Sequence, residues 1–342
     1  MKDKRERVSS KDVAREAGVS QATVSYVLNQ NPNVKIRPET RQAVLDAARR
    51  LNYHVDYIAR NMRLGKSASV AIVSNSNMPS YIFLRILEGI KSSLKDRNHS
   101  LTVSFANYTD IQDAEFIKSY YSNLVDGIVF VFCDLTEQDT EFLEEHQIPY
   151  VTINANYQPH GRHQIKTDLR PAMRDAVAQL KEAGHTNIGY IGQFAGDEKA
   201  MRYSAYRAAM RDQKMRVHGR FVYKVSGDED LMESAIAEQL DSALAEDKLP
   251  HVLLCDNILI GFYVQRYLHK NHISMPDKIA LVVIGSNDFC KRVYPSLSAV
   301  EAPLYAIGFR GSEFLFDIME SEGKIPADSI VLQWQFNRRE SS

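Results

Sequence analysis

Residues 9–29 constrain the fold more than any other stretch of the chain; they read SSKDVAREAGVSQATVSYVLN. This pattern predicts two short helices joined by a tight turn. Ser9 is a favourable N-cap with Asp12 as its capping partner, Gly18 can adopt the positive φ that ends the first helix, and Ser20 would cap the second. On the second helix we expect Val24, Val27 and Leu28 to face inward, and Gln21, Ala22, Ser25, Tyr26 and Asn29 to face outward.

Such a helix-turn-helix typically places its second helix in the major groove of DNA. A third helix is expected from about Pro38 to Leu51, because proline is favourable in a first helical turn and the apolar residues that follow would close a three-helix core. The N-terminal part of the chain therefore predicts a small all-α head.

The charge distribution sets this head apart from the remainder of the chain. Residues 1–66 carry 14 Lys/Arg and 7 Asp/Glu, whereas the remaining residues carry 28 and 36, so the net charge of −1 conceals a basic head and an acidic body. A basic module joined to an acidic one favours binding of a polyanion by the head and a different task for the body.

The sequence lacks the patterns that are typical of enzymes, metal-binding proteins and membrane proteins. The chain shows no phosphate loop, no Gly-x-Ser-x-Gly motif and no metal-ligand cluster, and its three cysteines are widely spaced. We therefore expect no enzyme, no cofactor and no metal site. The charged N-terminus and the lack of an apolar run of ~20 residues favour a cytoplasmic protein without a membrane partner.

Several motifs, in order, resemble the LacI/GalR family of bacterial transcription regulators. Its N-terminal motifs correspond to KDVAREAGVS at 11–20, ATVSYVLN at 22–29 and TRQAVLDAARRLNY at 40–53. Further similarities are VDGIVF at 125–130, IPYVTI at 148–153, GHTNIGYIG at 184–192, RYSAYRAAM at 202–210 and PSLSAVEAPLYAIG at 295–308. The resemblance therefore covers nearly the whole chain. It implies a repressor that binds a pseudo-palindromic operator in double-stranded DNA as a homodimer, under the control of a small-molecule effector such as a sugar or sugar phosphate.

We expect three segments: a helix-turn-helix DNA-binding domain at 1–55, a hinge helix and linker at 56–66, and an effector-binding and dimerisation domain at 67–342. In the third segment, buried strands alternate with helices, which predicts a doubly wound parallel α/β fold. The expected strands are 69–74, 100–106, 127–132, 150–153, 188–191, 252–255 and 279–284.

The resemblance implies that this third segment is a periplasmic-binding-protein-like clamshell of two doubly wound parallel-sheet lobes. We expect lobe N at about 67–167 and 299–329, and lobe C at about 168–298 and 330–342. The chain would cross between the lobes near Lys166–Asp168, Ser298–Ala302 and Asp328–Leu332.

By position, Gln21, Ala22 and Tyr26 match the family's base-contacting residues. Glutamine can form paired hydrogen bonds to adenine, and alanine can touch a thymine methyl group. Tyr26 stands where the family usually has arginine, so we expect a different base preference; it could instead stack on the sugar-phosphate edge or pack beside the third helix. Contacts to the DNA backbone are expected from Ser20, Thr23, Ser25, Asn29 and Tyr53. For Thr23, an ST-turn or a capping role accounts for the residue equally well.

The resemblance also implies that residues 56–64 form a hinge helix whose apolar residue enters the minor groove. Met62 takes the place of the family's usual leucine, and Arg60 and Arg63 flank it. A long apolar side chain can wedge between base steps and bend the duplex.

In the body, the positions that match the family's effector contacts are Asn154, Asp168, Arg202 and Asp256. The family has a further contact after the first lobe strand, for which Tyr81 is a candidate with Asn77 and Phe83 as alternatives. An arginine fork suits hydroxyl, carboxylate or phosphate groups. Asp168 could instead cap a helix. Asn154 replaces a common aspartate, and Cys255 replaces the asparagine that usually precedes Asp256. These departures favour an unusual effector, or control by a protein partner in place of a typical sugar.

Overall fold

The computed structural model divides the chain into two compact units, residues 1–67 and 68–342, and we describe each by itself. The structure describes residues 8–28, 34–51, 53, 69–74, 80–97, 99–153, 162–194, 197–225, 227–246, 248–285, 287–321 and 328–342.

The head is a three-helix unit made of α1 (Ser10–Ala17), α2 (Gln21–Leu28) and α3 (Pro38–Arg50). Gly18 ends α1 with φ at +65°, and the amide of Val19 donates to the carbonyl of Ala14. At the other end of α1, the Asp12 carboxylate accepts hydrogen bonds from both the backbone N–H and the hydroxyl of Ser9. The core residues of the head are Val13, Ala14, Val24, Val27, Val44, Ala47 and Ala48.

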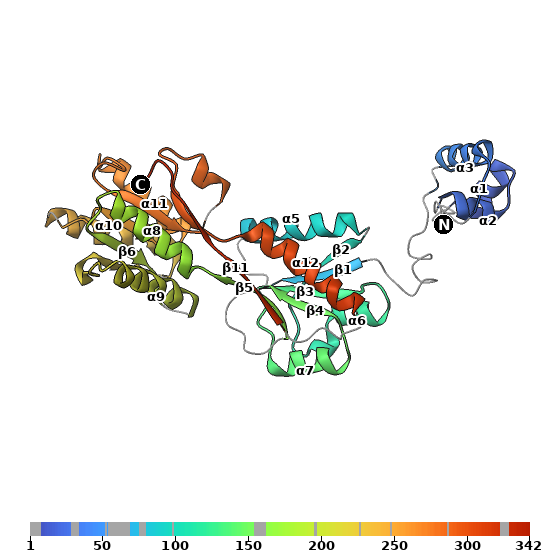
Figure 1. Cartoon of the computed structure of the whole chain (residues 1–342), viewed down its shortest axis with the longest axis horizontal. Coiled ribbons are helices and arrows are strands. Elements are labelled where there is room, and N and C mark those ends of the chain that lie inside the picture. Colours follow the sequence, from blue (N-terminus) through green and yellow to red (C-terminus); the bar gives the residue numbers. More distant parts are fainter. Residues whose placement is uncertain are drawn as a thin grey trace, which may run out of the picture. The chain divides into compact units, whose positions relative to one another are not determined.

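Lobe N is built on a six-stranded parallel sheet with the order β11-β5-β4-β3-β1-β2. Its strands are β1 (Ser69–Ser74), β2 (Ser100–Phe105), β3 (Gly127–Val131), β4 (Tyr150–Ile153), β5 (His163–Asp168) and β11 (Asp328–Gln333). Its helices are α5 (Ser80–Asp96), α6 (Glu115–Tyr121), α7 (Glu137–Glu145) and α12 (Leu304–Glu320), with a 3-10 turn η1 (Ile111–Asp113). Two separate apolar clusters lie on the two faces of the sheet, so helices cover both faces (Figure 1).

Lobe C has a second six-stranded sheet, with the order β12-β10-β9-β8-β6-β7. Its strands are β6 (Ile188–Gly192), β7 (Val222–Lys224), β8 (Val252–Cys255), β9 (Ala280–Ile284), β10 (Ser298–Glu301) and β12 (Gln335–Asn337). β12 pairs antiparallel with β10, and the other pairs are parallel. The helices are α8 (Arg170–Glu182), α9 (Asp197–Asp212), α10 (Glu229–Ala245) and α11 (Ile258–Lys270), with 3-10 turns η2 (Gly219–Phe221) and η3 (Asp288–Lys291).

The chain passes between the lobes after β5, after β10 and after β11, and this corrects two of the expected lobe boundaries. The boundary expected at 298/299 coincides with the start of β10, which pairs with β9 in lobe C. The boundary expected at 329/330 falls inside β11, which pairs with β5 of lobe N from Asp328 to Gln333. Each of these strands is hydrogen-bonded to a neighbouring strand of one lobe along its length. The chain can therefore pass to the other lobe only after the strand has ended.

Two of these crossings touch through the backbone. Trp334 lies between β11 and β12, and its backbone N–H donates to the carbonyl of Asp168 at the end of β5, at 3.1 Å. The Trp334 side chain packs against the apolar cluster beneath α8 and α9. The third crossing is therefore anchored both to the first and to the core of lobe C.

Candidate nucleic-acid interface and effector site

The outer face of α2 carries the residues expected to contact bases. Gln21, Ala22 and Tyr26 are exposed, and Tyr26 retains 39% of its accessible surface, whereas Val24 and Val27 on the opposite face retain 1% each. Packing of that apolar face against α1 and α3 fixes which side chains point away from the head. The contacts of the three exposed residues with bases stay a prediction.

Three hydrogen bonds lie at the start of α2: those between Ser20 and Thr23 belong to the cap expected from the sequence, whereas the bond from Gln21 to α1 was not expected. The Ser20 hydroxyl oxygen accepts from the Thr23 backbone N–H at 3.1 Å and shares a second bond, of 2.9 Å, with the Thr23 hydroxyl. The Gln21 amide nitrogen donates to the Ser10 hydroxyl oxygen at 2.7 Å. Ser20 therefore caps the helix, and Gln21 is tied to α1 in the free head.

The remaining residues of the expected DNA interface divide into two groups. Ser25 is exposed on α2, whereas Tyr53 is half-buried and packs against the core of the head. Its backbone N–H donates to the carbonyl of Ala48, at 2.8 Å, so the segment after α3 folds back onto that helix. Asn29, Arg60, Met62 and Arg63 lie outside the described residues.

In the body, the structure brings two of the expected effector residues together. Asp256 follows the end of β8 and is fully buried, and Arg202 reaches it from α9 with a side chain that is 17% exposed. An Arg202 Nη1–H donates to the Asp256 backbone carbonyl at 2.8 Å and lies 3.9 Å from Oδ1 of the Asp256 carboxylate. The position of the arginine fork is therefore set by the turn after β8.

The Asp256 carboxylate has a further partner that sequence reasoning missed. The Tyr190 hydroxyl, in β6, donates to Oδ1 of Asp256 at 2.8 Å, and burial raises the pKa of this tyrosine well above its usual value. Gly192 lies beside the same carboxylate, where a Cβ would approach the Cβ of Asp256 to 2.5 Å. Tyr190 and Asp256 are 66 positions apart, so no local pattern pointed to the pair.

Asp168 has a different set of contacts. Its carboxylate accepts from the Arg170 backbone N–H at 2.9 Å and from Nε and Nη2 of the Arg170 side chain, each at 2.8 Å. These bonds hold the pKa of Asp168 below its usual value. The carboxylate is thus bonded to the first residue of α8, whose N-cap is Leu169 and not Asp168, and its contact with an effector stays a prediction.

The last two expected effector residues are Tyr81 and Asn154. Tyr81, in the first turn of α5, is partly buried and packs against an apolar cluster of lobe C. Asn154 lies outside the described residues. Beside Asp256, the Cys255 thiol is buried, which raises its pKa above the usual range and keeps it protonated.

Over the ranges that the structure describes, His, Cys, Asp and Glu side chains do not gather in threes that would hold a metal ion. In the same ranges, none of the helices has the length and apolar character needed to cross a membrane.

Comparison with known proteins identifies relatives of both units. The family model for bacterial regulatory proteins of the lacI family matches residues 10–56, and the model for a periplasmic binding protein-like domain matches residues 177–342. Catabolite control protein A of Priestia megaterium is 26% identical over 324 residues, which is 94% of this chain and 95% of the relative. The Staphylococcus aureus (strain MRSA252) protein of the same name is 27% identical over 333 residues, with 96% and 97% covered.

Solved structures share the architecture. The lac repressor dimer bound to operator and the anti-inducer ONPF has a TM-score of 0.75 at 19% identity, covering 98% of this chain and 99% of that one. The complex of the transcriptional regulator CelR with cellobiose has a TM-score of 0.65 at 23% identity, covering 98% and 100%. A helix-turn-helix head and a two-lobe α/β body, as expected from the sequence, are thereby confirmed.

Proposed function

Because this chain belongs to the lacI family of bacterial regulatory proteins, we propose that it is a repressor that binds a pseudo-palindromic operator. The observation that carries the proposal is the outer face of α2, where Gln21, Ala22 and Tyr26 are exposed above a buried core in a basic head. A recognition helix presented in this way suits direct reading of base edges in the major groove.

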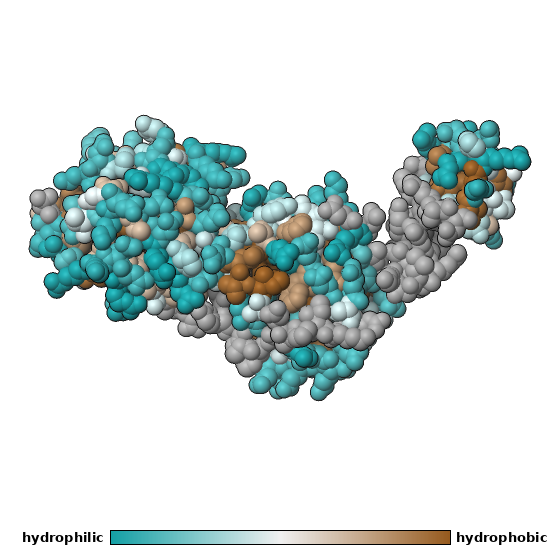
Figure 2. All heavy atoms as spheres, in the orientation of Figure 1, coloured by the Kyte–Doolittle hydropathy of each residue, from teal (hydrophilic) through white to brown (hydrophobic). Residues whose placement is uncertain are grey.

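We further propose that the operator is bound by a homodimer, since one head offers few base contacts and a two-fold dimer matches a palindromic site. Hydrophobic surface is visible on lobe N in Figure 2. Leu84 of α5, Phe105 of β2 and Tyr305 of α12 are among the large apolar side chains of this lobe that are exposed. Exposed apolar surface of this kind supports a contact with a second copy.

On the DNA, Arg60, Met62 and Arg63 would meet the minor groove, and the Met62 side chain would insert between base steps.

For the body we propose a small-molecule effector, a sugar or related metabolite, in the cleft between the lobes. Arg202 would bind its hydroxyl or anionic groups, because its guanidinium is held by the turn at Asp256. Tyr81, Asn154 and Asp168 would complete the site. Coupling of this site to operator occupancy would amount to about 1–3 kcal/mol, the range usual for allosteric control.

A specific observation favours a second candidate for this control. Two carboxylates expected to bind hydroxyl groups are already engaged, since Asp256 is fully buried against Tyr190 and Asp168 is bonded to Arg170. A protein partner on the body surface would then replace the small ligand. A metabolite screen read by thermal unfolding separates the two candidates, because a specific ligand of the folded body raises its melting temperature.

Selection of bound fragments from a genomic DNA library, at roughly physiological salt where non-specific attraction is suppressed, tests the operator proposal. An enriched pseudo-palindrome is expected for the full chain, and its loss is expected when residues 1–66 are deleted. Specific binding by the truncated chain would refute the assignment of the head. Recovery of no common motif, with or without added ligands, would refute sequence-specific regulation.

A further inference from the structure

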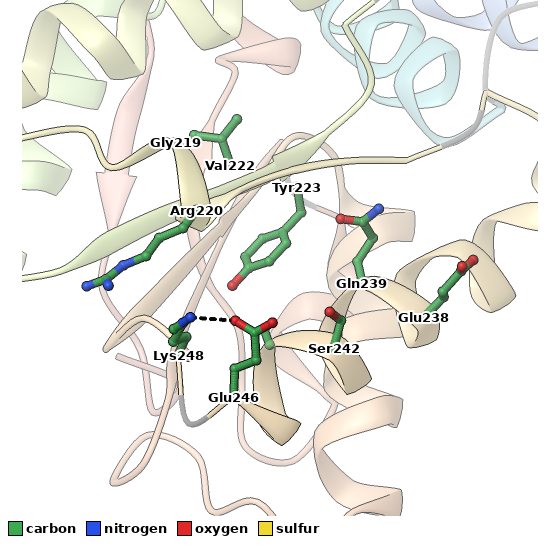
Figure 3. A pocket seen from close by; sticks show the side chains of 10 residues that line it. Gly219, Arg220, Val222, Tyr223, Glu238, Gln239, Ser242, Glu246 and Lys248 are labelled. Atoms are coloured by element: carbon green, nitrogen blue, oxygen red, sulfur yellow. Dashed lines mark hydrogen bonds and ion pairs between the residues drawn. The ribbon is translucent and has the colours of Figure 1, made fainter.

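Lobe C contains a hollow of about 390 Å³ between η2 and β7 on one side and the C-terminal half of α10 on the other (Figure 3). The elements that line it differ from β8 and α9, which carry Asp256 and Arg202. Its volume lies within the ~300–1,000 Å³ of typical ligand pockets. The hollow is therefore large enough for a small molecule and is distinct from the effector residues discussed above.

The Tyr223 hydroxyl is the feature that points to a ligand. Tyr223 belongs to β7 and is 4% exposed, and its ring extends from the strand toward α10 and Lys248 (Figure 3). Its hydroxyl oxygen is buried and has no hydrogen-bond partner among the residues that the structure describes. A phenylalanine would fill the same space without burying an unpaired polar group, so the hydroxyl stabilises nothing visible in the folded chain.

The charges around the hollow balance. Arg220 and Lys248 contribute two positive charges, and Glu238 and Glu246 contribute two negative ones. Lys248 Nζ lies 2.6 Å from a carboxylate oxygen of Glu246, so these two groups already neutralise each other. A ligand with a net charge would gain little from this lining, whereas an uncharged ligand would meet no unfavourable partner.

The polar groups are also suited to hydroxyls. Gln239 and Ser242, on the face of α10 that lines the hollow, each donate and accept hydrogen bonds, as a hydroxyl does. We propose that this hollow is a second small-molecule site that binds an uncharged polyhydroxylated compound, one oxygen of which accepts a hydrogen bond from Tyr223. Burial raises the pKa of Tyr223 to about 12, so its hydroxyl stays protonated and is a donor at neutral pH.

The test is hydrogen–deuterium exchange of the full chain, read on segments 219–225 and 238–246. Glucose, maltose and myo-inositol are the uncharged probes, and glucuronate and glucosamine match glucose with a negative or a positive charge. At least one uncharged probe is expected to slow exchange in both segments, by more than its charged counterparts. The protection is expected to disappear in Tyr223→Phe.

Tyr206→Phe is the matched control for stability, because the buried Tyr206 hydroxyl donates to the Ile188 carbonyl at 2.7 Å. We expect Tyr206→Phe to lower the free energy of unfolding and Tyr223→Phe to leave it unchanged or raise it. The proposal is overturned by protection that persists in Tyr223→Phe, or by protection from charged probes alone. A lack of protection by every uncharged probe, or a loss of stability in Tyr223→Phe equal to that in Tyr206→Phe, would also overturn it.

Discussion

At the scale of single residues, Gln21 combines a structural contact with a proposed recognition role. Its amide nitrogen bonds the Ser10 hydroxyl in the free head, whereas pairing with adenine requires both the nitrogen and the oxygen of the amide. Binding to an adenine would therefore exchange one hydrogen bond for two, so the contact with α1 orients Gln21 at little net cost.

Replacing Gln21 with alanine is expected to relax operator preference at one base pair by about 1–3 kcal/mol, the usual value of a paired contact. Competition binding with single-base operator variants measures this change. Gln42→Ala is the control, because Gln42 lies on α3 and bonds Asp46 on the same helix. An equal loss of preference in both variants would argue against recognition by Gln21.

The contacts of Asp256 lead to a second prediction at this scale, about the stability of the fold. Its carboxylate is fully buried and accepts a hydrogen bond from Tyr190, with the Arg202 guanidinium beside it. Asp256→Ala leaves both partners without this acceptor, and we expect a loss of about 3–5 kcal/mol in the free energy of unfolding, measured in urea. The exposed Asp113, changed to alanine, should shift it by no more than about 0.5 kcal/mol. Similar values for the two variants would show that the buried contacts do not stabilise the fold.

At the scale of elements, the helices α5 and α12 approach each other closely. Gly89 of α5 faces the backbone of Tyr305, and Gly308 of α12 faces the backbone of Ile86. At either glycine, a Cβ would overlap the opposing carbonyl oxygen, and backbone cannot move aside as a flexible side chain can. The two glycines therefore set how closely these helices approach.

Gly89→Ala is expected to lower the free energy of unfolding by about 1–3 kcal/mol, the usual penalty of overpacking. Gly308→Ala should act in the same direction. Gly227→Ala is the control, since a Cβ there meets nothing within 4 Å. Calorimetry of the three variants checks the prediction, and full stability of both helix variants would contradict the close approach.

The start of α1 makes a prediction about pH. Hydrogen bonds from Ser9 hold the pKa of Asp12 below its ordinary value of 3.8. Since the pKa of Asp12 is lower in the folded state, the stabilisation from these bonds is fully present above pH 3.8. It is lost as the pH falls through the folded-state pKa of Asp12. Ser9→Ala removes the hydroxyl and should raise the pKa of Asp12 toward 3.8, as measured by NMR titration of the carboxyl carbon. An unchanged titration would show that the hydroxyl contributes nothing.

The elements also show how far the sequence could predict this structure. Buried apolar runs located strands such as 69–74 and 252–255 at their observed bounds, because burial on both faces leaves a continuous signal. The two three-residue strands, β7 and β12, have no such run and were missed. The lobe boundaries were displaced at β10 and β11, because the sequence of a strand does not reveal which sheet it joins.

The same contrast applies to the candidate sites. Exposure of Gln21 and Tyr26 followed from helical periodicity, which acts within a few residues. The contact of Tyr190 with Asp256 and the environment of Tyr223 depend on segments far apart in the chain, and periodicity carries no information about them.

At the scale of the whole molecule, Trp334 connects two of the three crossings between the lobes and is the chain's only tryptophan. We expect an effector that changes the arrangement of the lobes to shift the intensity or wavelength of its fluorescence. Titration of the intact protein with a ligand found by thermal unfolding measures this, with Trp334→Phe as the control that removes the signal. A ligand that raises the melting temperature and leaves the emission unchanged would argue against movement at the crossings.

The order of strands in lobe N has a consequence for synthesis on the ribosome. The helix α12 and the strand β11 come late in the chain, yet α12 supplies Ile307, Phe314, Leu315, Phe316 and Ile318 to one core of this lobe. The described core of the head ends at residue 53, whereas lobe N must wait for residue 333, and until α12 is made one face of its sheet is covered only in part, by α5. A truncated product that ends after β10 would therefore carry a finished DNA-binding head on an unfinished body, and its exposed apolar surface would direct it to chaperones or proteases.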